Sequence, residues 1–212
     1  TKIQSSEYTG AANQKFKLVD VLEKPITGTG GIVGNIVSNG KIINCVNSGK
    51  ITGNKAVGGI AGCVTGGDPM IINCSSIGST AEYKKDCGYE HGGLVGFING
   101  EINTLTISNC FTSCAVNVTK DSGFAFGNNQ KAEKVSTDHI YYKDTGSTSN
   151  TVGTGKKLTG GTITRVSLMS DKKAEPLTKN TYTDEKLTIK KEIDGIRLTS
   201  WKRDGSFLEP QS

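Results

Sequence analysis

The sequence predicts an all-β fold, a parallel β-helix or solenoid of about four repeated coils with a C-terminal capping subdomain. Three observations support this prediction. A glycine-bracketed apolar block recurs along the first half of the chain, an Ile-x-Asn-Cys step follows the first three blocks at a similar distance, and large core-forming residues are scarce. A period of this size is typical of stacked, self-similar units rather than of one globular core.

The glycine blocks set the period of the repeat. Their second glycines are 28, 34 and 30 residues apart, and the blocks occupy residues 30–34, 58–62, 92–96 and, in a weaker copy, 122–127. The apolar runs inside them are short, rich in Ile and Val, and bounded by Gly, Asn, Ser and Thr. This pattern is typical of short buried strands separated by tight turns. Stacking each turn of chain on the previous one, about 4.8 Å away, would satisfy the backbone of every strand.

The Ile-x-Asn-Cys step follows the second glycine by 14, 15 and 17 residues. It places an asparagine before each of Cys45, Cys74 and Cys110, and in the fourth unit the same place is held by His139 and Ile140. Stacked coils would align these residues, so that asparagine amides could bond from rung to rung. The three cysteines would form a column, either as small apolar fillers or as disulfides between coils. The sequence leaves open whether the asparagine points inward or lies in a turn.

These paired motifs resemble the GLUG repeat. The resemblance is carried by residues 58–62 and 92–96, and by the Ile-x-Asn-Cys steps with the glycines that follow them, Gly49 and Gly78. It implies a β-solenoid displayed outside the cell, because the family occurs in bacterial surface and secreted proteins, including adhesins and regions attached to immunoglobulin A proteases. It implies no catalytic residues. The chain departs from the pattern in its fourth block and at Cys114, which stands where Gly49 and Gly78 stand in earlier copies.

Composition divides the chain into three expected regions. Residues 1–27 form an N-terminal lead-in or cap, residues 28–145 hold the repeats, and residues 146–212 form a loop and a C-terminal cap. Within this cap we expect a hairpin around residues 194–195 and a tryptophan, Trp201, that seals the cap against the end of the solenoid. No apolar run approaches the ~20 residues of a membrane span. We expect the chain to be part of a larger multidomain protein.

Charge and cysteine usage exclude several classes of partner. The net charge is +5, almost entirely from dispersed lysines with only three arginines, which argues against nucleic-acid binding. With two histidines and no paired Cys-x-x-Cys motifs, neither a metal site nor a cofactor is expected. Cys63 and Cys87 lie outside the repeated column and are the first candidates for a disulfide, with Cys110 and Cys114 as a weaker pair.

The longest insertion between repeats, residues 79–91, is the candidate binding site. Its aromatic and basic side chains suit a glycan or a host protein, and those singled out are Tyr83, Lys84, Lys85, Tyr89 and His91. The alternative is that a disulfide pins this loop and that it binds nothing.

The sequence therefore favours a non-catalytic extracellular module of a bacterial cell surface, either an adhesin-like stalk or a binding and display domain. The alternative is a polysaccharide-acting β-helix enzyme, a lyase or hydrolase. Such a hydrolase would need two carboxylates about 5–10 Å apart. Asp86 and Glu90 share the insertion, but nothing in the sequence places a second acid on the neighbouring coil, and the chain has no Gly-x-Ser-x-Gly motif.

Overall fold

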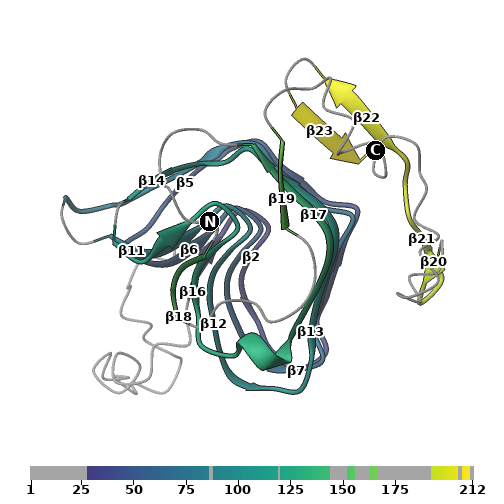
Figure 1. The fold of residues 1–212 in the computed structure, drawn as a ribbon, viewed down its shortest axis with the longest axis horizontal. Coiled ribbons are helices and arrows are strands. Elements are labelled where there is room, and N and C mark those ends of the chain that lie inside the picture. Colours follow the sequence, from purple (N-terminus) through teal and green to yellow (C-terminus); the bar gives the residue numbers. More distant parts are fainter. Residues whose placement is uncertain are drawn as a thin grey trace, which may run out of the picture.

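The computed structural model describes residues 28–85, 88–118, 120–143, 152–155, 163–166, 192–204 and 207–210. In these ranges the chain is all-β, with one short 3₁₀ turn, η1 (Ala132–Lys134). Short parallel strands wind into about four stacked coils, which Figure 1 shows along the stack, so that successive coils project onto one another. The predicted parallel solenoid is confirmed.

The first three coils pass in turn through four parallel sheets, and the later strands continue sheets 1, 2 and 3. Sheet 1 contains β1 (Thr29–Gly30), β6 (Lys55–Gly58), β11 (Tyr89–Gly92) and β15 (Ser122–Gly123). Sheet 2 contains β2 (Val33–Ile36), β7 (Ala61–Gly67), β12 (Val95–Ile102), β16 (Phe126–Asn129) and β18 (Val152–Gly155). Sheet 3 contains β3 (Lys41–Ile43), β4 (Val46–Asn47), β8 (Met70–Ile72), β9 (Ser75–Ser76), β13 (Leu105–Thr112), β17 (Val135–Lys143) and β19 (Ile163–Val166). Sheet 4 contains β5 (Lys50–Thr52), β10 (Ser79–Ala81) and β14 (Ala115–Asn117).

The register of sheet 3 aligns the predicted cysteine column. Val46 pairs with Ser75 and Ser75 with Phe111, so the preceding residues, Cys45, Cys74 and Cys110, stack on one another. In the fourth coil Ile140 pairs with Cys110, as the spacing predicts. All three cysteines are free thiols. Their position in the column agrees with the interpretation as small fillers.

The asparagine before each cysteine lies in a turn, which resolves the alternative that the sequence left open. Asn44, Asn73 and Asn109 have φ of 56°, 56° and 50°, and His139 in the fourth coil has φ of 47°. Asparagine and histidine are among the non-glycine residues that tolerate this left-handed region best. The chain bends at this point in every coil, and we call the column of these four residues the asparagine corner. The expected ladder begins with a 2.7 Å hydrogen bond from Asn73 Nδ2 to Asn44 Oδ1.

The glycine blocks form a second and tighter bend between sheets 1 and 2, which we call the glycine corner. A Cβ built on the first glycine, Gly58, would lie 1.9 Å from the carbonyl oxygen of Ala61. A Cβ on the second glycine, Gly59, would lie 1.9 Å from the hydroxyl of Ser76 on the opposite wall. Both glycines are therefore required by close approach of other atoms rather than by backbone angles.

The fourth block is shifted by one residue relative to the predicted alignment. Gly123 pairs with Gly92, so it takes the place of the first glycine and Phe124 takes the place of the second. Opposite Phe124, Tyr142 occupies the position that Thr112 holds in the third coil. The two rings stack with centroids 4.9 Å apart. The last full coil thus replaces a glycine and a small polar residue with an aromatic pair.

Figure 1 shows that the coil has two lobes joined by a narrow waist. Sheets 2 and 3 enclose the wide lobe, which contains the main apolar cluster, including Ile71, Leu94 and Phe126. Sheets 4 and 1 enclose the narrow lobe. The middle residue of each strand of sheet 4 is buried there, and Val57 and His91 of sheet 1 are fully buried beside it.

The C-terminal region differs from the predicted boundaries. The strands β18 and β19 continue sheets 2 and 3 as far as Val166, past the predicted limit at residue 145, and β18 lies in a stretch predicted to be a loop. The hairpin of β20 (Glu192–Ile193) and β21 (Ile196–Arg197) turns at residues 194–195 as predicted, and a second hairpin joins β22 (Trp201–Asp204) to β23 (Phe207–Pro210). The predicted cap at residues 1–27 lies outside the described residues.

Candidate functional site

The insertion lies at the tip of the narrow lobe, where the chain passes from β10 to β11. Two side chains hold the loop in place. Asn54, in the equivalent connection one coil earlier, accepts hydrogen bonds through Oδ1 from the backbone N–H groups of Tyr83 and Lys84, at 3.0 and 2.9 Å. Glu82 accepts a 3.0 Å hydrogen bond through Oε2 from the backbone N–H of Gly88. The loop is therefore anchored to the coil below it.

The structure separates the five predicted binding residues. Tyr83 is 72% exposed and Lys84 and Lys85 are exposed beside it, whereas Tyr89 is half-buried at the start of β11. His91 is fully buried in the narrow lobe and does not share a surface with the other four. Burial lowers the pKa of His91 to about 4, against the smaller opposing effects of the Asn54 and Gly53 backbone and of Glu82.

Tyr89 lies between two lysines of the neighbouring coils. The Lys55 and Lys120 ammonium nitrogens lie 5.3 and 5.6 Å from the centroid of its ring, and Lys55 is also 6.0 Å from the centroid of Phe97. These distances are those of cation–π contacts, each worth about 0.5–1 kcal/mol at exposed sites. We call Lys55, Tyr89, Phe97 and Lys120 the lysine–aromatic column.

Sequence reasoning found only Tyr89 of this column. The signal was available, because Lys55, Tyr89 and Lys120 each stand three residues before the first glycine of a block, at Gly58, Gly92 and Gly123. Counting from the second glycine misaligned the fourth block by one residue and hid the relation. Phe97 comes from β12, on the other side of the glycine corner, and no spacing rule within sheet 1 would have found it.

A buried carboxylate lies beside the column. Glu90 is 6% exposed, and its Oε1 accepts a 3.0 Å hydrogen bond from Asn128 Nδ2. Burial raises the pKa of Glu90, while the Asn128 hydrogen bond and the Lys55 charge act in the opposite direction. Cys63 is 1% exposed, and burial followed by the nearby Glu90 charge raises the pKa of its thiol to about 12. Its predicted partner, Cys87, lies outside the described residues, so that disulfide stays a prediction.

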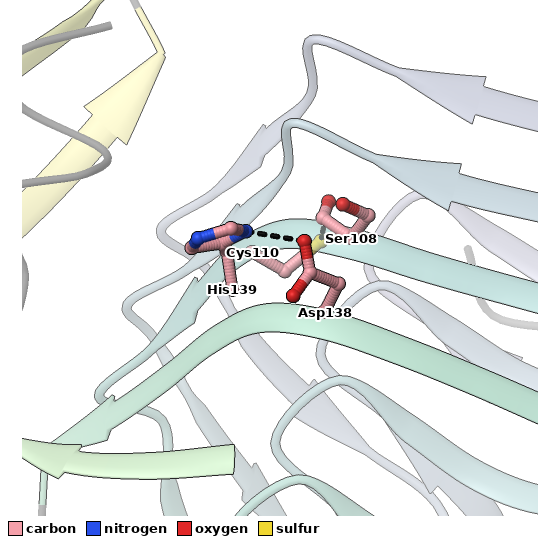
Figure 2. A network of polar contacts seen from close by, with 4 residues as sticks. All are labelled: Ser108, Cys110, Asp138 and His139. Atoms are coloured by element: carbon pink, nitrogen blue, oxygen red, sulfur yellow. Dashed lines mark hydrogen bonds and ion pairs between the residues drawn. The ribbon is translucent and has the colours of Figure 1, made fainter. Parts of the chain in front are cut away.

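Histidine, carboxylate, thiol and hydroxyl groups lie near one another at the asparagine corner of the last two coils. Figure 2 shows His139 Nδ1 paired with Asp138 Oδ2, with Ser108 and Cys110 on the coil next to them. The Cys110 thiol is fully buried and donates to the carbonyl oxygens of Ser108, at 3.1 Å, and Ile71, at 3.6 Å. The Cys110 thiol therefore contacts main-chain oxygens, not the imidazole of His139. His139 occupies the place that asparagine holds in the earlier coils. Cys110 and Cys114, the weaker disulfide candidates, are both buried free thiols.

The acids of the repeats are spread over the coils, apart from Glu90 and Asp121. Asp68 and Glu101 are exposed and Glu82 anchors the insertion. Glu90 is buried beside the column, close enough to Asp121 for the Asp121 charge to help raise its pKa. Asp86 lies outside the described residues. Among the described residues no group of three or more His, Cys, Asp or Glu side chains is placed to hold a metal ion. In the same part of the chain no helix is long and apolar enough to cross a membrane.

Comparison with known proteins gives one match. Residues 53–81 match the family model described as the GLUG motif, which confirms the predicted resemblance. This segment comprises Gly53 and Asn54 and the five strands from β6 to β10, so the motif corresponds to one complete coil of the solenoid. No curated protein and no solved structure matches the chain.

Proposed function

We propose that this chain is a non-catalytic surface module of a bacterial protein, an adhesin-like stalk or a binding and display domain. In this proposal the insertion and the lysine–aromatic column form its contact surface for a host glycan or protein. The module belongs to a larger protein and is exposed outside the cell. The coil-sized GLUG motif supports the first part, because the resemblance associates such coils with bacterial surface and secreted proteins.

The observation that carries the proposed contact surface is the position of Tyr83. It is the most exposed large apolar side chain among the described residues, and it stands on a loop anchored by Asn54 rather than in a coil. Exposed tyrosine offers an apolar ring for sugar or protein contact and a hydroxyl for hydrogen bonding. Lys84 and Lys85 beside it add exposed positive charges, and Lys55 and Lys120 of the column add two more next to the Tyr89 ring.

A direct test is attachment of the purified chain, immobilised on beads, to a panel of host glycans and matrix proteins. The double variant Tyr83→Ala and Tyr89→Ala should lower affinity for the bound partner at least tenfold, a loss of about 1.4 kcal/mol. Val37→Ala is the matched control, because Val37 is 57% exposed and lies in the turn between β2 and β3, away from the insertion. Equal attachment of the double variant and the wild type would contradict the proposal that this surface contacts the partner.

The non-catalytic part of the proposal has its own test. The chain is incubated with acidic and neutral polysaccharides, and new reducing ends and unsaturated uronic acids are measured. We expect neither above the level of a heat-denatured control. Turnover of any polysaccharide would replace this part of the proposal with the lyase or hydrolase alternative.

A further inference from the structure

The described part of the C-terminal segment 192–210, residues 192–204 and 207–210, lies along the side of the solenoid and not at its end. Figure 1 shows its two hairpins outside the coil, next to sheet 3. The strand β23 contacts β9 of the second coil, and Lys41 at the start of β3 pairs with Asp194 in the first hairpin. Trp201 therefore does not seal the end of the solenoid as predicted.

The asparagine corner binds the main chain of this segment. Asn44 donates through Nδ2 to the carbonyl oxygen of Arg197, at 2.9 Å, and accepts through Oδ1 from the backbone N–H of Thr199, at 3.1 Å. Its carboxamide thus pairs with the acceptor and the donor that flank Leu198. In the next coil Asn73 donates to the carbonyl oxygen of Thr199, at 2.9 Å. The asparagine corner therefore binds this segment through main-chain N–H and C=O groups, which every residue other than proline carries.

Side-chain anchors complete the contact. Trp201 is 4% exposed, and its indole N–H donates to Asn73 Oδ1. Leu198, between the two main-chain groups paired with Asn44, is 8% exposed. A buried indole that also makes a hydrogen bond is a common anchor of peptide and protein contacts.

The asparagine ladder does not continue beyond Asn73. The Asn73 Oδ1 accepts the hydrogen bond from the Trp201 indole, and the next rung, Asn109, is 2% exposed with an Nδ2 that has no hydrogen-bond partner among the described residues. A buried donor left unpaired costs about 1–3 kcal/mol. The segment shares the ladder's groups, because Asn44 Oδ1 accepts from both Asn73 Nδ2 and the Thr199 N–H. The unpaired Asn109 extends the row of carboxamides by one rung.

We propose that the asparagine corner is a peptide-binding track and that residues 192–210 are a peptide ligand carried by the same chain. The track takes an extended segment through main-chain hydrogen bonds to every second residue, with a tryptophan four residues after the first contact. Residues 167–191 separate the segment from β19, and 25 residues can span up to roughly 80 Å when extended. The corresponding segment of a second copy of this chain is the partner in trans that fits the track.

The test starts from the full chain, so that the solenoid folds with its own segment present. A protease site is inserted between residues 180 and 181, the purified protein is cleaved, and a labelled synthetic peptide of residues 192–210 is added. We expect the cleaved C-terminal fragment to co-elute with the solenoid. We also expect saturable peptide binding at micromolar concentrations, at least tenfold weaker in the uncleaved chain, where the tethered segment competes at high effective concentration.

Variants of the solenoid and of the peptide distinguish specific binding to the track from non-specific association. The double variant Asn44→Ala and Asn73→Ala should weaken peptide binding at least tenfold, whereas Asn117→Ala, an exposed asparagine on β14, should leave it unchanged. In the peptide, Trp201→Ala should weaken binding at least tenfold. Thr199→Ala should weaken it by less than threefold, because the shorter Thr199 contacts are made by its main chain and its hydroxyl accepts only a 3.4 Å hydrogen bond from Asn73. Peptide variants need no refolding of the solenoid. Release of the fragment on cleavage, or failure of the peptide to bind a solenoid that keeps its β-sheet circular dichroism, would overturn the proposal.

Discussion

The glycine corner and the asparagine corner both turn the chain once in each coil, yet they do so by opposite means. At the first glycine of the glycine corner, backbone atoms pack so closely that no side chain fits, as the 1.9 Å distance at Gly58 shows. At the asparagine corner the turn depends on a left-handed residue whose side chain remains available to bond to its neighbours or to another segment. The first corner fixes the cross-section of the solenoid, and the second leaves polar groups free to take on a further role.

The largest expected effect is at the glycine corner. Gly58→Ala would place a Cβ against the Ala61 carbonyl oxygen and 2.8 Å from the Gly96 nitrogen, and both of these backbone atoms would have to move. We expect a loss of about 3 kcal/mol or more in the free energy of unfolding, measured by urea denaturation. Gly66→Ala is the matched control, because its Cβ would lie no closer than 3.5 Å to another atom. Equal stability of the two variants would contradict the account of this corner.

A pH-dependent effect is expected next to the same corner, at His91. The unfolded chain takes up a proton on this histidine near pH 6.5, whereas the folded chain does so only near pH 4. Stability from this group is complete above pH 6.5 and is lost between pH 6.5 and 4, up to about 3 kcal/mol. Glu90, whose pKa is raised, acts in the opposite direction. His91→Gln should therefore flatten the fall in stability between pH 7 and 4.5 relative to the wild type; an unchanged slope would contradict the prediction.

The smallest effect is expected at the asparagine corner. Asn109 has φ of 50° and an unpaired buried amide nitrogen, so Asn109→Gly removes both the backbone strain and the orphaned donor. We expect a change within about 0.5 kcal/mol, or a gain in stability. Asn109→Ala keeps a Cβ in the left-handed region and should cost about 1–2 kcal/mol. Thermal denaturation of the two variants measures the difference, and a stability order of Ala above Gly would show that the left-handed conformation at this position does not penalise a Cβ.

The sequence predicts those parts of the fold that repeat. The cysteine column, the substitution of His139 for asparagine and the matching of Cys114 to Gly78 all follow from counting residues along the period, because stacking places equivalent positions over one another. The sequence did not predict whether the asparagine side chain points into the core or lies in a turn. The inward–outward alternation of side chains along a strand fails where one residue adopts a left-handed conformation.

Features outside the period were missed or misplaced. In the lysine–aromatic column, Phe97 of sheet 2 lies outside the period and meets Lys55 of sheet 1 across the glycine corner. The burial of His91 depends on the narrow lobe, whose existence no local pattern indicates. The position of Trp201 against Asn73 joins residues 128 apart, and the single copy of this contact gives no spacing to count.

The coil-sized motif at residues 53–81 has a consequence for how such a chain can change in length. Each internal coil forms the same kind of backbone hydrogen bonds with the coil before it and the coil after it. The glycine corner and the asparagine corner lie at the same two places in each coil. Both ends of the motif lie at the tip of the narrow lobe. Duplication or deletion of one such segment in a gene would lengthen or shorten the rod by one step without redesign of its cross-section. The length of the solenoid would then depend on the number of copies of the motif, while a loop carried on one coil would keep its orientation about the axis.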